Sequence, residues 1–405
     1  MEKRGVNSIT FALIIEESWM KIVFNKKSAL ILIIGFLYFA VGDVSRFLGL
    51  FGLSREIAYG LFFLLFLLFA VQRITKIKPY DALIIVVILT ISLMGTLQYG
   101  QYISSLTSKL APLLIFFPSY IFFRLYDFKK LEDMFEKAAI FSGIFLLVYY
   151  VLVVRSSGAT YSMSYAYWIS FPIVCFTGLF LRKRKIVYLI LGILMLITLL
   201  IAGSRGALLL TVICIFYLII SEIFKQGTST RKIIIITGLG LFIFAILYFS
   251  DNILAYLSQY SNTSRNIRML LNGGMLESAS RDRIHELCKQ LVGQNTWGYG
   301  PLASRQLLLG HNYPHSLWYE LQLDYGSISG VMLFVIIMFM AIMNLVRYRN
   351  KKESILVSFI SIIGIGSLMV SSSYLYEMYV PATVAMYINW NLNYKHSKVN
   401  GDKVG

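Results

Sequence analysis

The chain has 405 residues, of which 58% are hydrophobic and 14% are charged. A soluble domain carries about a quarter charged residues, so this composition excludes a soluble globular protein and indicates an integral membrane protein. The formal net charge is +17, but the basic residues fall in small clusters between apolar runs. That distribution favours anionic lipid headgroups as neighbours and argues against nucleic acid as a partner.

The first 27 residues precede the first long apolar run. Acidic residues interrupt their apolar stretch and no small-residue cleavage site follows, so we expect no cleavable signal peptide. Phe11, Ile15, Trp19 and Ile22 recur at helical spacing. This spacing favours an amphipathic helix lying on the membrane surface.

Twelve apolar segments follow, each near the length that a helix needs to cross the hydrocarbon layer. They are 28–45, 57–72, 82–96, 110–125, 138–154, 165–181, 186–202, 207–224, 233–250, 326–346, 354–372 and 374–391. The sequence therefore predicts an all-α integral membrane protein with about 12 transmembrane helices.

Lysine and arginine residues fall unevenly on the two sides that these segments define. One side, which includes both ends of the chain, receives 26 of them, against 5 in the short loops of the other side. This bias predicts that both termini are cytoplasmic. The predicted organisation is a cytoplasmic N-terminus (1–27), nine helices (28–250), an extracytoplasmic loop with short helices (251–325), three helices (326–391) and a cytoplasmic tail (392–405).

Arg205 lies in the turn "GSRG" between two strongly apolar segments, on the predicted outer side. A charge so close to hydrocarbon is costly and has either a partner or a function, although an arginine can also reach the interface by snorkelling. The flanking small residues favour function, because they let a bulky polar ligand approach the backbone.

The long loop contains a second arginine-bearing motif, "SASRDR". Residues 281–292 predict an amphipathic helix with Ile284, Leu287, Cys288 and Leu291 on one face. Arg281 then lies in its first turn, where the helix dipole disfavours a cation unless an anion is near. A solvated loop face is the alternative for Arg281 and Arg283.

The stretch "HNYPHSLWYELQLDYG" carries His311, His315, Glu320 and Asp324 at the entrance to a membrane segment. Pro314 favours a helix that starts there, with His315 in its first turn. The helix dipole would keep that imidazole neutral, as a proton acceptor must be; a structural interfacial histidine is the alternative. Pro314 separates the two histidines and no matching third ligand follows, so we predict no metal site. The three cysteines likewise predict neither a disulfide nor a zinc site.

In order and spacing, these motifs resemble the O-antigen polymerase and O-antigen ligase superfamily of bacterial membrane glycosyltransferases. The resemblance covers roughly residues 186–346. It is carried by Arg205, Ala279-Ser280-Arg281, Gly298 and Gly300, and His315-Ser316 followed by Glu320 and Gly326. The loop has Ala-Ser-Arg where the family often has Ser-Gly-Arg, which leaves the choice between Arg281 and Arg283 open. Ser316 stands where Asn is common, and a second His-Asn pair at 311–312 makes His311 the alternative to His315.

The resemblance implies a GT-C-like fold and a site that faces the exterior of the bacterial cytoplasmic (inner) membrane. It implies a polymerase that moves glycan repeat units, with inversion, from an undecaprenyl-diphosphate-linked donor to a sugar hydroxyl of a lipid-linked acceptor. Arg205 and Arg281, with Arg283 as helper, would bind the diphosphate; His315, or His311, would be the base, and Glu320 would orient it or begin a helix. No cofactor is needed, and a chain-length regulator and a flippase are the expected partners.

Two other functions fit the same sequence. An O-antigen ligase of the superfamily shares the chemistry and differs in the acceptor; the departure from Asn after His315 favours a polymerase. A flippase or other transporter of lipid-linked oligosaccharides also fits twelve spans, but transporters carry polar groups near the bilayer midplane and internal repeats. The polar groups here gather at the outer rim instead.

Overall fold

The computed structural model describes residues 77–103, 109–110, 112–125, 132–155, 162–202, 204–224, 279–308 and 313–401, with scattered positions between 44 and 66. In these residues every regular element is helical. The predicted N-terminal amphipathic helix and the predicted spans 28–45, 57–72 and 233–250 lie wholly or mostly outside them. His311 also lies outside them.

Eight of the predicted apolar segments coincide with helices in the described residues. Five helices of the described residues are long and apolar enough to cross a membrane. Three of them are single α-helices: α9 (Met163–Lys183), α11 (Arg205–Ile223) and α18 (Ser327–Tyr348). The other two continue into a short turn: α5 (Pro79–Tyr99) with a 3₁₀ turn gives the span Pro79–Tyr102, and α8 (Glu132–Tyr149) with a π-helical turn gives the span Glu136–Val153. Three further apolar helical stretches are shorter. The first, Pro112–Leu125, includes α7 (Phe117–Leu125), and the second is α10 (Ile186–Ala202). The third, Ser354–Val370, consists of α19 (Ser354–Ser358), a π-helical turn and α20 (Ile365–Val370). An all-α membrane protein is therefore confirmed, whereas the number of spans and their orientation stay predictions.

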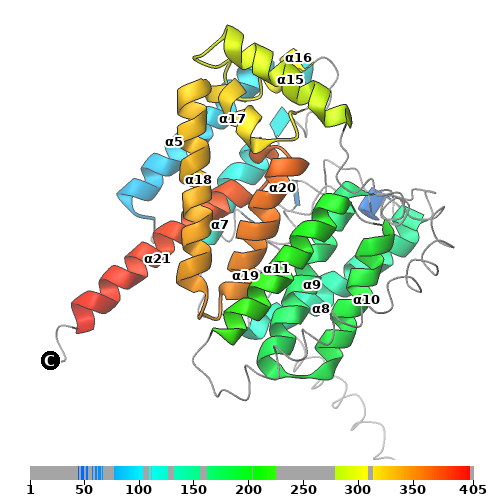
Figure 1. Cartoon of the computed structure of the whole chain (residues 1–405). Helices are drawn as coiled ribbons and strands as arrows, with labels where there is room; N and C mark the ends of the chain where they lie inside the picture. The colour runs from blue at the N-terminus through cyan, green and yellow to red at the C-terminus, as the bar shows by residue number, and fades with distance from the viewer. Residues whose placement is uncertain are drawn as a thin grey trace, which may run out of the picture.

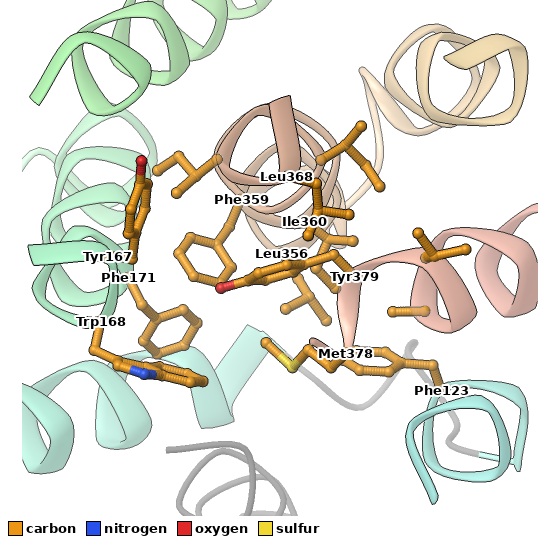
Figure 2. Close-up of a cluster of buried hydrophobic side chains, with 14 of the residues drawn as sticks. Phe123, Tyr167, Trp168, Phe171, Leu356, Phe359, Ile360, Leu368, Met378 and Tyr379 are labelled. Atoms are coloured by element: carbon orange, nitrogen blue, oxygen red, sulfur yellow. The ribbon is translucent and has the colours of Figure 1, made fainter. Parts of the chain in front are cut away.

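The core of the bundle lies where α9, α11 and the α19–α20 stretch meet α21 (Tyr379–Gly401). Figure 2 shows Phe359 between the side chains of Phe171 and Tyr379, and its ring packs edge-on against Phe171 at 5.2 Å and Tyr379 at 6.3 Å. A Cβ at Gly364 would fall on the Tyr379 ring. Aromatic rings and small residues together thus let these helices pack closely.

One end of the bundle, here called the capped end, is covered by short helices from the long loop. In Figure 1, α15 (Ala279–Gln294) runs across the tops of the upright helices, close to α16 (Ser304–Leu307) and α17 (Leu317–Tyr325). The predicted apolar face of α15 is confirmed: Ile284 and Cys288 are buried in a small cluster with Leu308 and Leu323. This cluster holds α15 against α17.

The opposite end of the bundle is rich in basic residues. Arg124 forms a 2.8 Å ion pair with the buried carboxylate of Asp81 and donates a hydrogen bond to Asn389 at 2.8 Å. Arg182 donates hydrogen bonds to the carbonyl oxygens of Lys351 and Lys352. These contacts tie α5, α7 and α21 together, and α9 to the turn before α19.

The last helix differs from the prediction. Residues 374–376, which the prediction placed at the start of the last span (374–391), form a separate 3₁₀ turn. α21 begins only at Tyr379 and continues to Gly401, into the predicted tail. The turn is held away from the helix by hydrogen bonds to α17. At the other end, no proline or glycine interrupts the chain between Pro381 and Gly401, so nothing there ends the helix earlier.

Candidate functional site

Two carboxyl groups are buried at the capped end. Glu320 and Asp324 lie one turn apart on α17, and their residues are 2% and 3% exposed. Their spacing of four residues puts both side chains on the same face of the helix. A buried acid needs hydrogen-bond donors, and the chain supplies them from the segment just before α21.

Glu320 is bonded to the turn at 373–374. The hydroxyl of Ser373 donates to one carboxylate oxygen, and the backbone N–H of Tyr374 donates to the other at 3.3 Å. Burial raises the pKa of Glu320 to about 7, although both hydrogen bonds and the charge of Arg305 favour the ionised form. Glu320 lies in the first turn of α17, and its hydrogen bonds hold the 373–374 turn, so they do not perform the expected orientation of His315.

Asp324 takes part in a tyrosine network. The hydroxyl of Tyr374 donates to Asp324 Oδ2 at 2.8 Å and lies 2.9 Å from the hydroxyl of Tyr325. Burial, with a further contribution from the charge of Glu320, raises the pKa of Asp324 well above its ordinary value. Burial and proximity therefore disfavour a negative charge on both acids at once.

The glycines of the "GYG" motif explain how the loop reaches this pair. Gly298 and Gly300 have φ of +85° and +97°, and a Cβ at Gly298 would lie 2.7 Å from the carbonyl oxygen of Asp324. The backbone N–H groups of Tyr299 and Gly300 donate to the carbonyl oxygens of Leu323 and Asp324 at 2.7 and 3.0 Å. These residues therefore fix the loop to the end of α17 by close backbone contact.

Arg305 of α16 lies beside the acid pair, between two tyrosine rings. Its Cζ is 4.5 Å from the ring centroid of Tyr376 and 5.8 Å from that of Tyr313. Such distances are those of cation–π contacts. The ring of Tyr313 is in turn 4.4 Å from the imidazole of His315, so the cation, the aromatic rings and the histidine form one cluster.

His315 does not lie in the first turn of a helix as predicted. α17 begins at Leu317 with Ser316 as its N-cap, and His315 precedes it with a φ of +56°. A left-handed conformation is uncommon for a residue other than glycine and costs about 1 kcal/mol or more. It turns the chain sharply between Pro314 and the helix, and His315 is half-buried there.

Arg205 is the first residue of α11. Ser204 caps the helix by accepting a hydrogen bond from Ala207 N–H at 3.2 Å. The next residue, Gly206, packs against α9 and α20, since a Cβ there would lie 2.8 Å from the Tyr167 hydroxyl and 3.1 Å from Val370. A side chain in place of Gly206 would push the arginine turn away from Tyr167.

A chain of contacts joins the Arg205 turn to the His315 segment. Ser371 Oγ and Tyr167 Oη lie 2.7 Å apart in a hydrogen bond, and the hydroxyl of Tyr313 donates to the carbonyl oxygen of Ser371 at 2.7 Å. Tyr167 touches the position next to Arg205, and Tyr313 is two residues from His315. The structure therefore brings Arg205 and His315 to the same end of the bundle.

Arg281 and Arg283 lie in the first turns of α15, which covers this end (Figure 1). Arg281 is half-buried and Arg283 is exposed. Neither arginine forms an ion pair of 4.0 Å or less with another described residue. Both arginines therefore lie on α15 at the capped end, and the choice between Arg281 and Arg283 as the family's arginine stays open.

Sequence analysis missed the residues that line the rest of the cluster: Arg305, Tyr313, Ser373, Tyr374 and Tyr376. One signal was present, because Arg305 is the sole lysine or arginine between Lys289 and Arg347. The tyrosines and Ser373 gave no comparable signal, since aromatic and small polar residues are common at membrane interfaces.

No protein-family model matches the chain, and no curated protein matches it. The described residues contain no group of three or more histidine, cysteine, aspartate or glutamate side chains that could hold a metal ion. What the cluster offers chemically is a cation whose buried Nε–H donor has no acceptor among the described residues, a half-buried imidazole, and a buried acid pair that holds the surrounding turn in place.

Proposed function

We propose that the protein is a membrane glycosyltransferase that polymerises glycan repeat units carried on undecaprenyl diphosphate. The observation that supports this most is the series of contacts through Tyr167 and Ser371 that joins the Arg205 turn to the segment carrying His315. A glycosyl transfer from a lipid diphosphate needs a cation for the leaving group and a base for the incoming hydroxyl. These two groups come from distant parts of the chain and lie at one end of the bundle.

In the proposed reaction, the acceptor hydroxyl oxygen attacks the anomeric carbon of the donor glycan. The bond between that carbon and the diphosphate oxygen breaks, its electron pair leaves on undecaprenyl diphosphate, and the hydroxyl proton passes to His315. A single displacement inverts the anomeric configuration. Arg205, with Arg281 and Arg283, stabilises the departing diphosphate, because the planar guanidinium matches phosphate oxygens.

The bacterial inner membrane is the proposed location, with the capped end facing the exterior. Basic residues cluster at the opposite end, as the positive-inside bias of membrane proteins requires of a cytoplasmic face. A lipid-linked acceptor suits a polymerase, and Ser316 in place of Asn favours a polymerase over a ligase.

The experiment uses the purified full chain in proteoliposomes with a lipid-linked oligosaccharide donor. We expect a ladder of products longer than one repeat, and a loss of about 10²–10⁴-fold in rate when His315 is replaced by Ala, the range that a general base contributes. Lys289→Ala is the matched control, because this exposed α15 lysine is already paired with Glu286 at 3.1 Å.

Other outcomes distinguish the alternatives. Transfer of one glycan to a non-lipid acceptor without a ladder would indicate a ligase. Movement of a labelled lipid-linked glycan across the bilayer without product would indicate a transporter. Wild-type ladders from His315→Ala and Arg205→Ala would overturn the proposal.

A further inference from the structure

Arg305 is close to two carboxyl groups without being their ion-pair partner. The oxygens of Glu320 accept hydrogen bonds from Ser373 and Tyr374, and the hydroxyl of Tyr374 binds Asp324. Within the described residues, no ion pair of 4.0 Å or less includes Arg305. The acid pair is therefore bonded to the 373–374 turn, and the guanidinium makes no direct ion pair with it.

Two aromatic rings fix the position of the guanidinium. It faces the rings of Tyr376 and Tyr313, and stacking on an aromatic face leaves the edge of the guanidinium plane open to a ligand. Its Nε is buried and has no hydrogen-bond partner among the described residues. A buried charged donor without an acceptor is costly, and a ligand that supplies oxygens would remove that cost.

The position of Arg305 also relates it to the proposed chemistry. Tyr313 lies between the guanidinium and His315, with ring contacts to both, and it binds Ser371 on the path to Arg205. An anion held by Arg305 would therefore lie next to the proposed base and on the side of the cluster that leads to the Arg205 turn.

We propose that Arg305 is an additional oxyanion-binding residue and that it holds the diphosphate of the lipid-linked donor. The identity of this ligand rests on the proposed function. Two guanidinium N–H groups can bind two phosphate oxygens side by side, and the same contacts stabilise the negative charge that the diphosphate gains as the glycosidic bond breaks. Tyr376 and Tyr313 keep the guanidinium in place while the ligand comes and goes.

Direct binding measurements on the purified full chain test this residue. The probes are inorganic diphosphate, nanodiscs that contain undecaprenyl diphosphate, and nanodiscs of phosphatidylglycerol alone. We expect Arg305→Ala to weaken binding of undecaprenyl diphosphate about tenfold or more, since hydrogen bonds to charged groups contribute about 1.5–3 kcal/mol. Arg305→Lys should recover part of the affinity, and Lys289→Ala should bind as the wild type does.

The three probes separate the sources of phosphate. A loss confined to the two diphosphate probes supports the proposed subsite. An equal loss with phosphatidylglycerol nanodiscs would mean that Arg305 senses the charge of the membrane surface, and would overturn the proposal. Unchanged binding of all three probes by Arg305→Ala would also overturn it.

A purely structural role for Arg305 makes a different prediction. If the residue only balances the charge of Glu320, then Glu320→Gln should restore both the thermal stability and the ligand binding of Arg305→Ala. In our proposal the double variant regains stability but not diphosphate binding. Should Arg305→Ala not fold, Arg305→Gln, which keeps the aliphatic part of the side chain without its charge, gives the same comparison.

The outcomes also separate this inference from the proposed function. If the wild type forms polymer but Arg305→Ala binds diphosphate normally, the inference alone fails. If Arg305 is required for diphosphate binding but the wild type forms no glycan product from any donor, the proposed function alone fails.

Discussion

The hydroxyl of Tyr313 donates a 2.7 Å hydrogen bond to the carbonyl oxygen of Ser371. This bond joins the segment that carries His315 to the end of α20, where Ser371 Oγ also binds Tyr167. Since Gly206 packs on the Tyr167 hydroxyl, the position of Arg205 relative to His315 depends on a short series of contacts through two tyrosines and one serine.

Arg205 can be separated from the packing around it by two substitutions. Arg205→Ala should reduce the rate of glycan transfer about tenfold or more, because it removes charge-assisted hydrogen bonds to the leaving group. Arg205→Lys should retain part of the rate, since lysine keeps the charge but not the planar fork. Product formed per amount of folded protein in proteoliposomes measures both. Equal rates for the two variants and the wild type would remove Arg205 from the site.

Gly206→Ala tests the packing of the arginine turn on Tyr167 and leaves the guanidinium of Arg205 unchanged. Its Cβ would meet the Tyr167 hydroxyl at 2.8 Å, so the arginine turn or the tyrosine has to move. We expect a loss of transfer rate with Arg205 still present, accompanied by a lower thermal unfolding midpoint. Gly192→Ala on α10 is the matched control, because its Cβ would meet Phe176 at an ordinary contact distance of 3.7 Å.

The buried acid pair predicts how stability depends on pH. Burial raises the pKa of Glu320 from 4.5 to about 7, so between these values the folded protein binds more protons than the unfolded chain. The stabilising contribution is then fully present below pH 4.5 and is lost as pH rises toward 7. Thermal unfolding midpoints across this range should fall for the wild type and fall less for Glu320→Gln. If the wild-type midpoint instead rose steadily between pH 5 and 7, and the rise were absent in Glu320→Gln, the assignment of a raised pKa to Glu320 would be contradicted.

The raised pKa of Asp324 predicts that its amide analogue is tolerated at neutral pH. Asp324→Asn resembles the protonated acid and should cost less stability than Tyr374→Phe. The latter removes the donor to a buried oxygen and should cost about 1–3 kcal/mol in the free energy of unfolding. Unfolding of the two variants at pH 7 checks this order, and a larger cost for Asp324→Asn would show that the carboxylate form is required.

At the opposite end, Arg124 and Asp81 form a buried ion pair with side chains 10% and 1% exposed. Arg124→Ala leaves the Asp81 carboxylate with Tyr120 as its side-chain donor at 2.7 Å. Removal of one partner from a buried pair costs about 3–5 kcal/mol, so the variant should unfold at a markedly lower temperature. The double variant Arg124→Leu with Asp81→Asn should recover much of the loss, and failure to do so would mean that the pair is needed for packing of α5 on α7.

The glycines of the "GYG" motif were visible in the sequence, but their role depended on the fold. Gly298 and Gly326 meet each other's backbone, with a Cβ at Gly326 falling 2.7 Å from the carbonyl carbon of Trp297. A pattern of glycines predicts a turn, but it does not identify the distant backbone segment that the turn will contact.

What the sequence determined by itself was the helical membrane architecture and the amphipathic face of α15. Both follow from the period and length of apolar runs, which depend on neighbouring residues along the chain. The position of His315 before α17, the displaced start of α21 and the setting of Arg305 between two tyrosines were decided only by tertiary structure. Each depends on a partner far along the chain, such as Glu320 for the 373–374 turn, and local patterns carry no information about such pairings.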